Sequence, residues 1–304
     1  MKERLPLAII GNGAAAAEAV LALRASGYSG AIDLFADNHH PPYNPMLGTY
    51  LVAGAIPLER AFPFGDERTF YQANTVTTHL GHPIVRLDAE ERLLVTAQGD
   101  EHLYDRCLVA SGAKTAVPPI PGLREALAER DGDFPADAAS AARRVFTIQD
   151  LAGVLALKRA VDKLRETAVS GPGKGTTAPR AAVIGASFAG IKIAAVLHDS
   201  GFRVTLVERE PRLLPLAALP DCARLMEEHL LREGYELRLG ASLTSVSTEA
   251  TAEAGQPGVR LDFGSLPGAA HPSGDAGTAC EESANQLVVN LVVVCTGTRP
   301  ALSF

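Results

Sequence analysis

AIIGNGAAAAEAV (residues 8–20) joins an apolar run to an alanine-rich segment through two glycines, Gly11 and Gly13. Glycines between a strand and a helix let backbone N–H groups at the helix start come close to an anion such as a diphosphate. Ala16 stands where a third glycine is usual, and one extra methyl group is tolerated at that position. Taken alone, the stretch predicts either a dinucleotide-binding turn or a ligand-free turn into a helix.

The flanking sequence favours the dinucleotide interpretation. It predicts a short strand at 5–10, a helix at 14–26 and a second strand at 31–36. Strand, glycine turn, helix and strand within about 30 residues form a βαβ unit. Asp37 ends the second strand, slightly beyond the usual spacing of about 20 residues, and is the expected ribose acceptor. Asp33 lies inside that strand and is expected to face solvent.

The same order of elements recurs in the second half of the chain. An apolar strand at 181–184 leads into GASFAG at 185–190, a helix then runs to residue 200, and a strand follows at 203–208. Ser187 replaces the middle glycine of this turn, and its hydroxyl group is a candidate contact to a phosphate. The repeat predicts a second nucleotide site.

Glu208, at the end of the last of these strands, bears on the choice of nucleotide. A carboxylate there hydrogen-bonds a ribose 2′-hydroxyl and repels a 2′-phosphate, which favours NAD(H) over NADP(H). Arg209 and Arg212 follow, and we interpret them as solvated surface residues rather than as a phosphate site. The sequence therefore predicts NADH as the favoured nucleotide and leaves NADPH open.

Each half also closes in the same way. CLVASGAK (107–114) and LVVVCTGTR (291–299) are apolar strands that end in a small hydroxyl residue and a glycine. Between these landmarks each half has a predicted meander, with strands at 83–88, 92–97 and 102–110 and at 241–247, 258–263 and 287–295. We infer an internal duplication and an α/β fold of two Rossmann-like domains, each with a meander, a parallel sheet and a helical layer.

Composition and charge exclude several classes of partner. The chain has 304 residues, 47% hydrophobic and 21% charged, with a formal net charge of −7. This acidic balance opposes binding to nucleic-acid phosphates or anionic membranes. No apolar stretch reaches the roughly 20 residues that a membrane helix needs. The cysteines form no C-x-x-C pair, which favours reduced thiols in a cytoplasmic protein; they are Cys107, Cys222, Cys280 and Cys295.

Composition also marks linkers and insertions. VPPIPG at 117–122 is stiff and non-helical, and residues 124–142 are expected to form a partly helical surface insertion. SGPGKGT at 170–176 is expected to be a flexible loop, because it follows a helix predicted at about 149–167 rather than a strand. Residues 265–285, rich in Gly, Pro, Ser and acids, are expected to form a mobile hairpin.

The histidines supply no strong metal candidate. We expect His79 and His82 to be exposed loop residues rather than ligands, because no acidic cluster accompanies them in the sequence. We therefore predict no metal site, and the spacing of residues assigns no catalytic side chain.

Four motifs together resemble a known family. AIIGNGAAAAEAV, YDRCLVASGAKTAVPPIPG, AAVIGASFAGIKIAAVL and LVVVCTGTRP are similar to motifs of the FAD-dependent pyridine nucleotide-disulfide oxidoreductase superfamily, in the same order. The resemblance runs from residue 5 to about residue 300. It is strongest to members without a redox disulfide, such as ferredoxin-reductase-like and nitrite-reductase-like flavoproteins.

This resemblance implies an FAD-binding domain with an NAD(P)-binding domain inserted in it. The implied boundaries are 1–122 for the N-terminal segment of the FAD domain, 123–142 for a linker or insertion, and 143–304 for the NAD(P) domain. The implied FAD residues are Gly11, Gly13, Ala16, Asp37, Ala110, Ser111 and Gly112. The implied residues for the nicotinamide nucleotide are Gly185, Ser187, Gly190, Glu208 and Gly297.

The resemblance further implies an NAD(P)H-dependent oxidoreductase in which hydride passes from nicotinamide to flavin and electrons pass on to an acceptor. The acceptor is open, with a ferredoxin-type protein as one candidate. PPYNPMLGTYLVAG (41–54) resembles the family's stretch beside the flavin, but Gly48 and Thr49 replace its serine and lysine. His39 and His40 precede it, and a solvated turn is favoured for them over a place at the flavin edge.

In the family the chain continues after GTRP with a second flavin motif and a dimerisation domain, and we expect both to be absent here. Two alternatives to a flavin enzyme therefore stay open. One is a truncated, catalytically inactive nucleotide-binding protein or fragment. The other is a chain whose missing flavin-domain elements come from a partner subunit.

Overall fold

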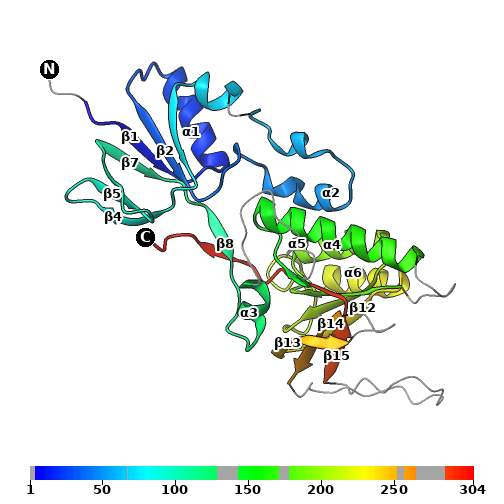
Figure 1. Cartoon of the computed structure of the whole chain (residues 1–304). Helices are drawn as coiled ribbons and strands as arrows, with labels where there is room; N and C mark the ends of the chain where they lie inside the picture. Colours follow the sequence, from blue (N-terminus) through cyan, green and yellow to red (C-terminus); the bar gives the residue numbers. More distant parts are fainter. Residues whose placement is uncertain (1–3, 67, 129–142, 171–177, 252–256, 265–284) are drawn as a thin grey trace, which may run out of the picture. The chain divides into compact units, whose positions relative to one another are not determined.

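The structure, a computed structural model, describes residues 4–66, 68–128, 143–170, 178–251, 257–264 and 285–304 (Figure 1). It divides into two compact units. The first comprises Met1–Leu47, Ile56–Lys114 and Thr298–Phe304, and the second Gly48–Ala55 and Thr115–Gly297. The domain boundaries implied by the sequence, which concern nucleotide binding, remain predictions.

A four-stranded parallel sheet forms the centre of the first unit. In spatial order its strands are β3 (Val76–Leu80), β2 (Ile32–Ala36), β1 (Leu7–Ile10) and β7 (Arg106–Val109). Successive side chains of a strand point to opposite faces. Ile9 accordingly packs with the buried alanines of helix α1 (Ala14–Ala25), whereas Ala8 and Ile10 pack on the other face. The helix α1 follows β1 directly, as the sequence predicts (Figure 1).

An antiparallel meander covers the second face of this sheet. Its strands are β4 (Ile84–Asp88), β5 (Leu93–Thr96) and β6 (Glu101–Leu103). Ile84 and Leu94 of the meander and the neighbouring Tyr104 are buried in one cluster with Ala8 and Ile10. The first unit therefore has the three predicted layers.

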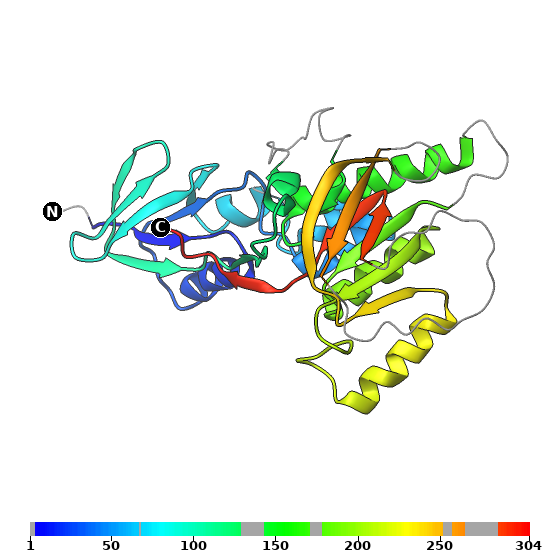
Figure 2. The ribbon, with the colours of Figure 1, turned by 90° about the horizontal axis from the view of Figure 1, so that it is seen from below.

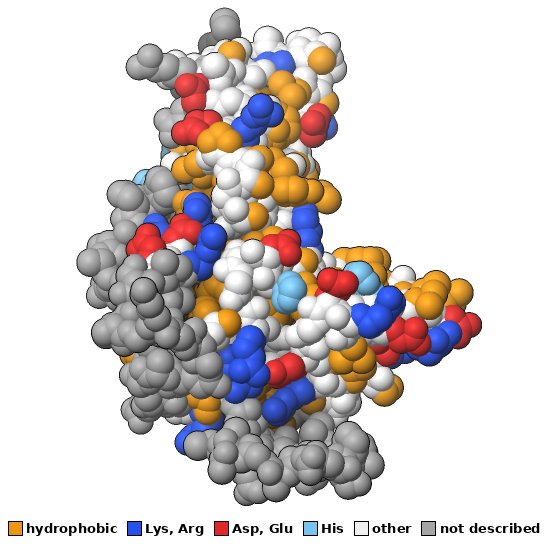
Figure 3. All heavy atoms as spheres, turned by 90° about the vertical axis from the view of Figure 1, so that its right-hand side faces the viewer, with side chains coloured by type: hydrophobic (Ala, Val, Ile, Leu, Met, Phe, Trp, Pro, Cys, Tyr) orange, Lys and Arg blue, Asp and Glu red, His pale blue; other side chains and the backbone are white. Residues whose placement is uncertain are grey.

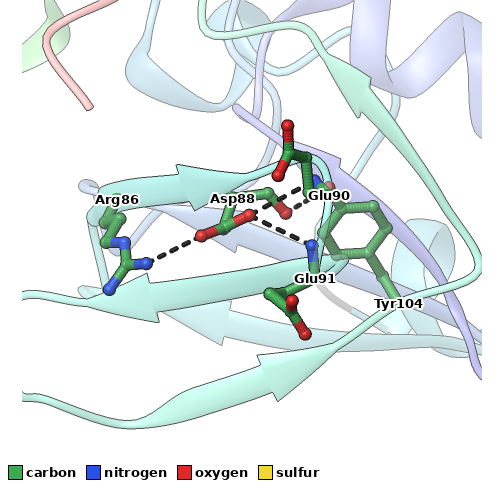
Figure 4. Close-up of polar contacts among 5 residues, drawn as sticks. All are labelled: Arg86, Asp88, Glu90, Glu91 and Tyr104. Atoms are coloured by element: carbon green, nitrogen blue, oxygen red, sulfur yellow. Dashed lines mark hydrogen bonds and ion pairs between the residues drawn. The ribbon is translucent and has the colours of Figure 1, made fainter.

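Asp88 stabilises the turn between β4 and β5 (Figure 4). Its carboxylate accepts hydrogen bonds from the backbone N–H groups of Glu91 (3.1 Å) and Glu90 (3.2 Å) and from the Arg86 guanidinium (2.7 Å). The bond from Glu91 is the largest cause, followed by Arg86, of a pKa of Asp88 below its ordinary value. The Tyr104 hydroxyl donates to the backbone carbonyl of Asp88 (3.2 Å), which ties the turn to the segment after β6.

Short elements connect these layers. In the first unit they are η1 (Pro45–Leu47), η2 (Leu58–Ala61) and the π-helical turn η3 (Arg68–Gln72). Strands β8 (Ala113–Thr115) and β17 (Thr298–Pro300) pair as a two-stranded ribbon. Helix α2 (Gly48–Val52) belongs to the second unit.

The second unit repeats the plan of the first with one more strand. Its parallel sheet has the order β12 (Glu236–Leu239), β11 (Arg203–Glu208), β10 (Arg180–Ile184), β16 (Leu291–Val294) and β9 (Val145–Phe146). Its helices are α3 (Leu123–Ala128), α4 (Leu151–Ser170), α5 (Phe188–Asp199) and α6 (Pro220–Arg232). Helix α5 packs on β10 and β11, as α1 follows β1 in the first unit.

A second meander, of β13 (Leu243–Thr251), β14 (Pro257–Phe263) and β15 (Gln286–Val289), completes this unit. Val259 and Leu261 of β14 are fully buried with Ala182, Val292 and Val294 of the parallel sheet. Figure 2 shows the meander strands, drawn from gold to orange, crossing the parallel strands of this unit. Both halves are thus three-layer α/β units with parallel sheets, which confirms the predicted fold class.

Two predicted strands are wrong as single elements. The strand predicted at 102–110 is divided into β6 and β7, and Asp105 between them donates its N–H to the carbonyl of Pro6 (2.9 Å). The strand predicted at 287–295 is divided into β15 and β16 at Asn290, whose side-chain oxygen accepts the N–H of Arg180 (2.9 Å). In each case an apolar run passes from the meander to the parallel sheet, a change that periodicity does not reveal.

Three predicted insertions lie largely outside the described residues. They are the surface insertion at 124–142, of which the structure describes the part within α3, the loop at 170–176 and the hairpin at 265–285. Within the described ranges, no helix is both long and apolar enough to cross a membrane.

Charge is mixed over the visible surface. On the face shown in Figure 3, acidic and basic side chains are interspersed with apolar ones. Exposed leucines occur in and just before α6, namely Leu216, Leu219, Leu225 and Leu231.

Candidate nucleotide-binding sites

The first glycine turn is tight on one side and open on the other. Gly11 has φ +112°, and a Cβ added to it would collide with the backbone carbonyl of Ala110. Its N–H donates to the carbonyl of Phe35 in β2 (2.8 Å). Gly13 is the N-cap of α1, and a Cβ added there would meet nothing within 4 Å. The turn therefore needs glycine at 11 for its fold, whereas Gly13 faces open space.

This open space lies at the start of α1. The N-cap Gly13 makes no side-chain capping bond, and Ala14 and Ala15 of the first turn are exposed. The N–H groups of a first helical turn precede the intrahelical bonds and carry partial positive charge. Ala16 is fully buried against the sheet side of α1, where its methyl group is accommodated. Replacing the third glycine with Ala16 therefore changes only the packing of α1 on the sheet. It does not affect the open space beside Gly13.

Asp37 lies where the sequence predicts, directly after β2. It is exposed, and its carboxylate is 3.7 Å from the ammonium group of Lys114 in β8. Ala110, Ser111 and Gly112 follow β7 and border the same turn, since Ala110 donates its N–H to the carbonyl of Ile10 (2.7 Å). The predicted FAD residues are thus gathered at the carboxyl ends of β1, β2 and β7, the usual ligand edge of such sheets.

The second glycine turn has the same construction. Gly185 has φ +99°, donates its N–H to the carbonyl of Val207 (2.8 Å), and has no room for a Cβ, which would lie 2.5 Å from the carbonyl oxygen of Cys295. A Cβ on Gly190 would collide with the carbonyl of Gly185, so this third glycine permits close packing of α5. Cys295 donates its N–H to the carbonyl of Ile184 (2.7 Å), which matches the bond of Ala110 in the first unit. The structure therefore shows the duplication at the level of single hydrogen bonds.

Ser187 is the N-cap of α5. Its hydroxyl oxygen accepts the N–H of Gly190 (3.3 Å), and the hydroxyl is 3.4 Å from the carbonyl of Cys295. Gly297, with φ +94°, follows the end of β16 and accepts the N–H of Ala116 (2.9 Å). The hydroxyl of Ser187 thus has a structural task, and its predicted phosphate contact remains a prediction.

Glu208 reaches back to the second turn. One carboxylate oxygen accepts the N–H of Ala186 (2.9 Å) and the other the N–H of Glu210 (3.0 Å). Arg209 pairs with the Glu210 carboxylate at 3.3 Å. The interpretation of Arg212 as a solvated residue is wrong, because its guanidinium donates to backbone carbonyls that include Ala218 (2.8 Å) and Pro215 (2.7 Å). Arg212 therefore holds the loop after β11 through these hydrogen bonds.

The sequence did not single out Asn12, between the two glycines of the first turn. Asn12 is only 6% exposed and hydrogen-bonds to the loop after β2 and to Tyr71 in η3. Its polar side chain within the glycine motif could have indicated such a role, because the equivalent position in the second half is Ala186.

The prediction that His79 and His82 are exposed loop residues is wrong for His79. It lies in β3, where its ring stacks on Phe35 with centroids 4.4 Å apart. His102 of β6 packs edge-on against it at 4.9 Å, and burial, reinforced by the charge on His79, lowers the pKa of His102. The part of the chain that the structure describes contains no group of three or more His, Cys, Asp or Glu side chains arranged to hold a metal.

Two cysteines near the glycine turns have thiol pKa values above the ordinary value. Burial raises the pKa of Cys295 to about 12 and that of Cys107 to about 11. Cys222 is exposed, and these three are unpaired in the described residues, outside which Cys280 lies. A protonated thiol is a poor nucleophile, so Cys295 beside the second turn is suited to packing rather than to covalent chemistry.

The geometry defines a class of protein with two dinucleotide-binding folds. In each unit a glycine turn leads into a helix, and an acid lies at the end of the next strand, Asp37 just after β2 and Glu208 as the last residue of β11. A Cβ at Gly13 would meet nothing within 4 Å and the first turn of α1 is exposed, so backbone N–H groups at this helix start are accessible to an anion such as a diphosphate. The residues present therefore fit such a ligand.

Comparison with known proteins gives the family. The model of the pyridine nucleotide-disulphide oxidoreductase family matches residues 5–304, and the chain belongs to this family. Rubredoxin-NAD(+) reductase of Ectopseudomonas oleovorans is 28% identical over 80% of this chain and 54% of its own length. The NADH-dependent phenylglyoxylate dehydrogenase subunit epsilon of Aromatoleum evansii is 26% identical over 97% of this chain and 57% of its own.

A solved structure shows the same fold. The water-forming NADH oxidase from Lactobacillus brevis, bound to NADH, superposes with a TM-score of 0.74 at 19% identity, over 98% of this chain and 54% of that one. The chain therefore spans about half the length of the proteins it matches.

Proposed function

We propose that this chain is an NAD(P)H-dependent FAD oxidoreductase, or its two-nucleotide part, with FAD in the first unit and NAD(P)H in the second. The observation that carries the proposal is the pair of equivalent glycine turns, each made tight by a glycine with positive φ. Family membership supports it, as do relatives named as NAD(+)- or NADH-dependent proteins. We assign the FAD segment to 1–122, the link to 123–142 and the NAD(P) domain to 143–304.

In the first unit, backbone N–H groups at the start of α1 hold the diphosphate where Gly13 leaves room. Asp37 accepts hydrogen bonds from the ribose once it turns from Lys114, to which it is only loosely paired at 3.7 Å. The buried Ala16 keeps α1 close to the sheet. Ala110, Ser111 and Gly112 border the bound nucleotide on the side of β7. Bound FAD supplies the capacity to accept hydride, while the protein orients it.

In the second unit, Glu208 accepts the ribose hydroxyls of the nicotinamide nucleotide, and we propose NADH as the preferred form for this reason. Gly185, Ser187 and Gly190 shape the diphosphate turn, and Gly297 borders it at the end of β16. Arg212 is held by backbone carbonyls and is not available to neutralise a 2′-phosphate without opening its loop.

We propose a small redox protein as the electron acceptor. The support is that one relative is named a rubredoxin-NAD(+) reductase and another a ferredoxin reductase subunit, from Sphingobium.

The decisive test is an absorption spectrum of the purified chain with and without added FAD. The expected protein is yellow, or becomes so with FAD, and its flavin absorbance bleaches when NADH is added without oxygen. A chain that stays colourless after incubation with FAD refutes the proposal. Calorimetric binding of NADH or ADP without any flavin reduction would instead support an inactive nucleotide-binding protein.

One observation favours the alternative in which another polypeptide segment completes the first unit. In the second sheet β9 covers β16, and Leu291, Val292, Val293 and Val294 are all at most 1% exposed. In the first sheet β7 is the edge strand, and Leu108 and Val109 are 38% and 42% exposed. FAD retention that appears only when a second defined polypeptide is co-expressed would support this alternative.

A further inference from the structure

The side chain of Asn12 joins three segments of the first unit. Its amide nitrogen donates to the backbone carbonyl of His40 (2.7 Å) and lies 3.2 Å from the side-chain oxygen of Asn38. Its amide oxygen accepts the hydroxyl of Tyr71 (2.6 Å). Asn12 is 6% exposed and Tyr71 is 3% exposed, so the bond between them is buried, and the two bonds from the Asn12 amide nitrogen are partly buried. Shielded bonds of this kind hold their partners more rigidly than bonds at the surface.

The three segments are those that a nucleotide would contact or depend on. Asn12 itself lies between Gly11 and Gly13 in the turn. Asn38 and His40 follow Asp37 in the loop after β2. Tyr71 is packed in the cluster beneath α1 that includes Ala16, Ala17 and Val20. The Asn12 amide therefore sets the spacing between the diphosphate turn and the loop that carries the ribose acceptor.

In the second unit the glycine turn is also linked to the end of the next strand, but by the acid and not by a residue of the turn. Ala186 occupies the position of Asn12 and has no side chain that could reach the loop after β11. There the acid itself, Glu208, bridges to the turn through the N–H of Ala186 (2.9 Å). In the first unit the side chain of the turn residue makes the bridge, and Asp37 is left exposed. In both units a hydrogen bond thus links the glycine turn to the region at the end of the second strand. In the first unit Asn12 of the turn makes this bond, whereas in the second unit the acid Glu208 makes it.

We propose that Asn12, supported by Tyr71, is a positioning residue of the first nucleotide site, fixing the distance between the backbone N–H groups at the start of α1 and Asp37. The proposal rests on the proposed binding of FAD in this unit. Asn12 is hydrogen-bonded within the protein and acts on the ligand through the turn and the loop.

Asn12→Asp is the sharpest perturbation, because it keeps the shape of the side chain but replaces the N–H donor with an oxygen that is charged near neutral pH. One carboxylate oxygen still accepts from Tyr71, but the other then faces the carbonyl of His40 and the side-chain oxygen of Asn38. Only the protonated acid donates to His40 and restores the bridge. The FAD affinity of this variant, relative to wild type at the same pH, is therefore expected to be weaker by about tenfold near neutrality and to recover toward acid pH.

Two further variants separate positioning from folding. Tyr71→Phe keeps the ring packed on Phe70, removes one hydrogen bond to Asn12 and is expected to weaken FAD binding roughly three- to tenfold at every pH. Asn74→Asp is the matched control, since the Asn74 amide also donates to a backbone carbonyl, that of Phe70 (2.7 Å), in the same unit. Its FAD affinity is expected to show no recovery toward acid pH.

The experiment titrates the whole chain with FAD by calorimetry across pH, with NADH titrated into the same variants to monitor the second site. Recovery of FAD affinity toward acid pH in Asn12→Asp, with unchanged NADH affinity, supports the proposal. A wild-type chain that binds FAD while Asn12→Asp binds it equally well at all pH values overturns the proposal alone. If the wild type binds neither FAD nor ADP, the proposed function falls, and this proposal falls with it.

Discussion

Replacing Glu208 with alanine removes a carboxylate that accepts two backbone N–H groups, those of Ala186 (2.9 Å) and Glu210 (3.0 Å). Hydrogen bonds to a charged group contribute about 1.5–3 kcal/mol each when shielded. Glu208 is half-buried and water can replace part of these bonds, so we expect a loss of about 1–3 kcal/mol in unfolding free energy. The larger consequence concerns the nucleotide.

A ribose hydroxyl bound by Glu208 donates to a charged acceptor. Losing this bond should weaken NADH binding by about 1.5–3 kcal/mol, roughly 10- to 150-fold. NADPH has a phosphate in place of the 2′-hydroxyl, so it does not lose this bond and should gain from the removal of the charge that repels its 2′-phosphate. The ratio of NADPH to NADH affinity is therefore expected to rise at least tenfold or so in Glu208→Ala.

The assay is calorimetric titration of the whole chain with NADH and with NADPH, which does not depend on turnover. Glu208→Gln serves as the near-isosteric variant, because it keeps one acceptor oxygen for the turn but carries no charge. Glu210→Gln is the matched control, since the Glu210 carboxylate pairs with Arg209 (3.3 Å) and, among the described residues, makes no hydrogen bond to the turn. An unchanged ratio of the two affinities in Glu208→Ala would show that our assignment of this residue is wrong.

Three further predictions concern the first unit. Gly11→Ala should unfold this unit, because φ +112° is strained for alanine and its Cβ would collide with Ala110, whereas Gly13→Ala should fold normally and lose FAD affinity; thermal unfolding and FAD titration check both. Asp88 has a lowered pKa, so its stabilisation is present above its ordinary value of 3.8 and is lost as pH falls through the folded value; Asp88→Asn should flatten this acid limb in urea unfolding. His102 also has a lowered pKa, so stability should fall as pH drops below its ordinary value of 6.5, and His102→Gln should remove this slope in the same assay.

Local patterns predict much of this fold. The βαβ units around Gly11 and Gly185 follow from short apolar strands, glycine turns and helices of regular spacing, all of which are set by neighbouring residues. The strand breaks at Asp105 and Asn290 could not be predicted, because they depend on Pro6 and Arg180, which are distant in the sequence. The partner of His79 was missed for the same reason, since Phe35 lies on a neighbouring strand.

At the candidate sites, too, some features could be predicted from the sequence and others could not. Gly11 and Gly185 could be chosen from sequence because each is required by its own backbone conformation. The task of a polar side chain depends instead on what the fold brings near it. Arg212 was expected in solvent and in fact holds backbone carbonyls. Only the assembled unit shows that the Asn12 amide reaches His40 and Tyr71.

The two units differ most in how the acid after the second strand is held. Glu208 is engaged with the backbone of its turn before any ligand binds, so its carboxylate is already oriented and little side-chain entropy is lost on binding. Asp37 is exposed and only loosely paired with Lys114, so ordering it would cost more. If FAD binds there as proposed, the hydrogen bond from Asn12 to His40 would offset part of this cost by fixing the loop instead of the acid. The two units therefore share the glycine turn and the acid at the end of the strand, but the side chain that links them is Glu208 at the strand end in the second unit and Asn12 in the turn in the first.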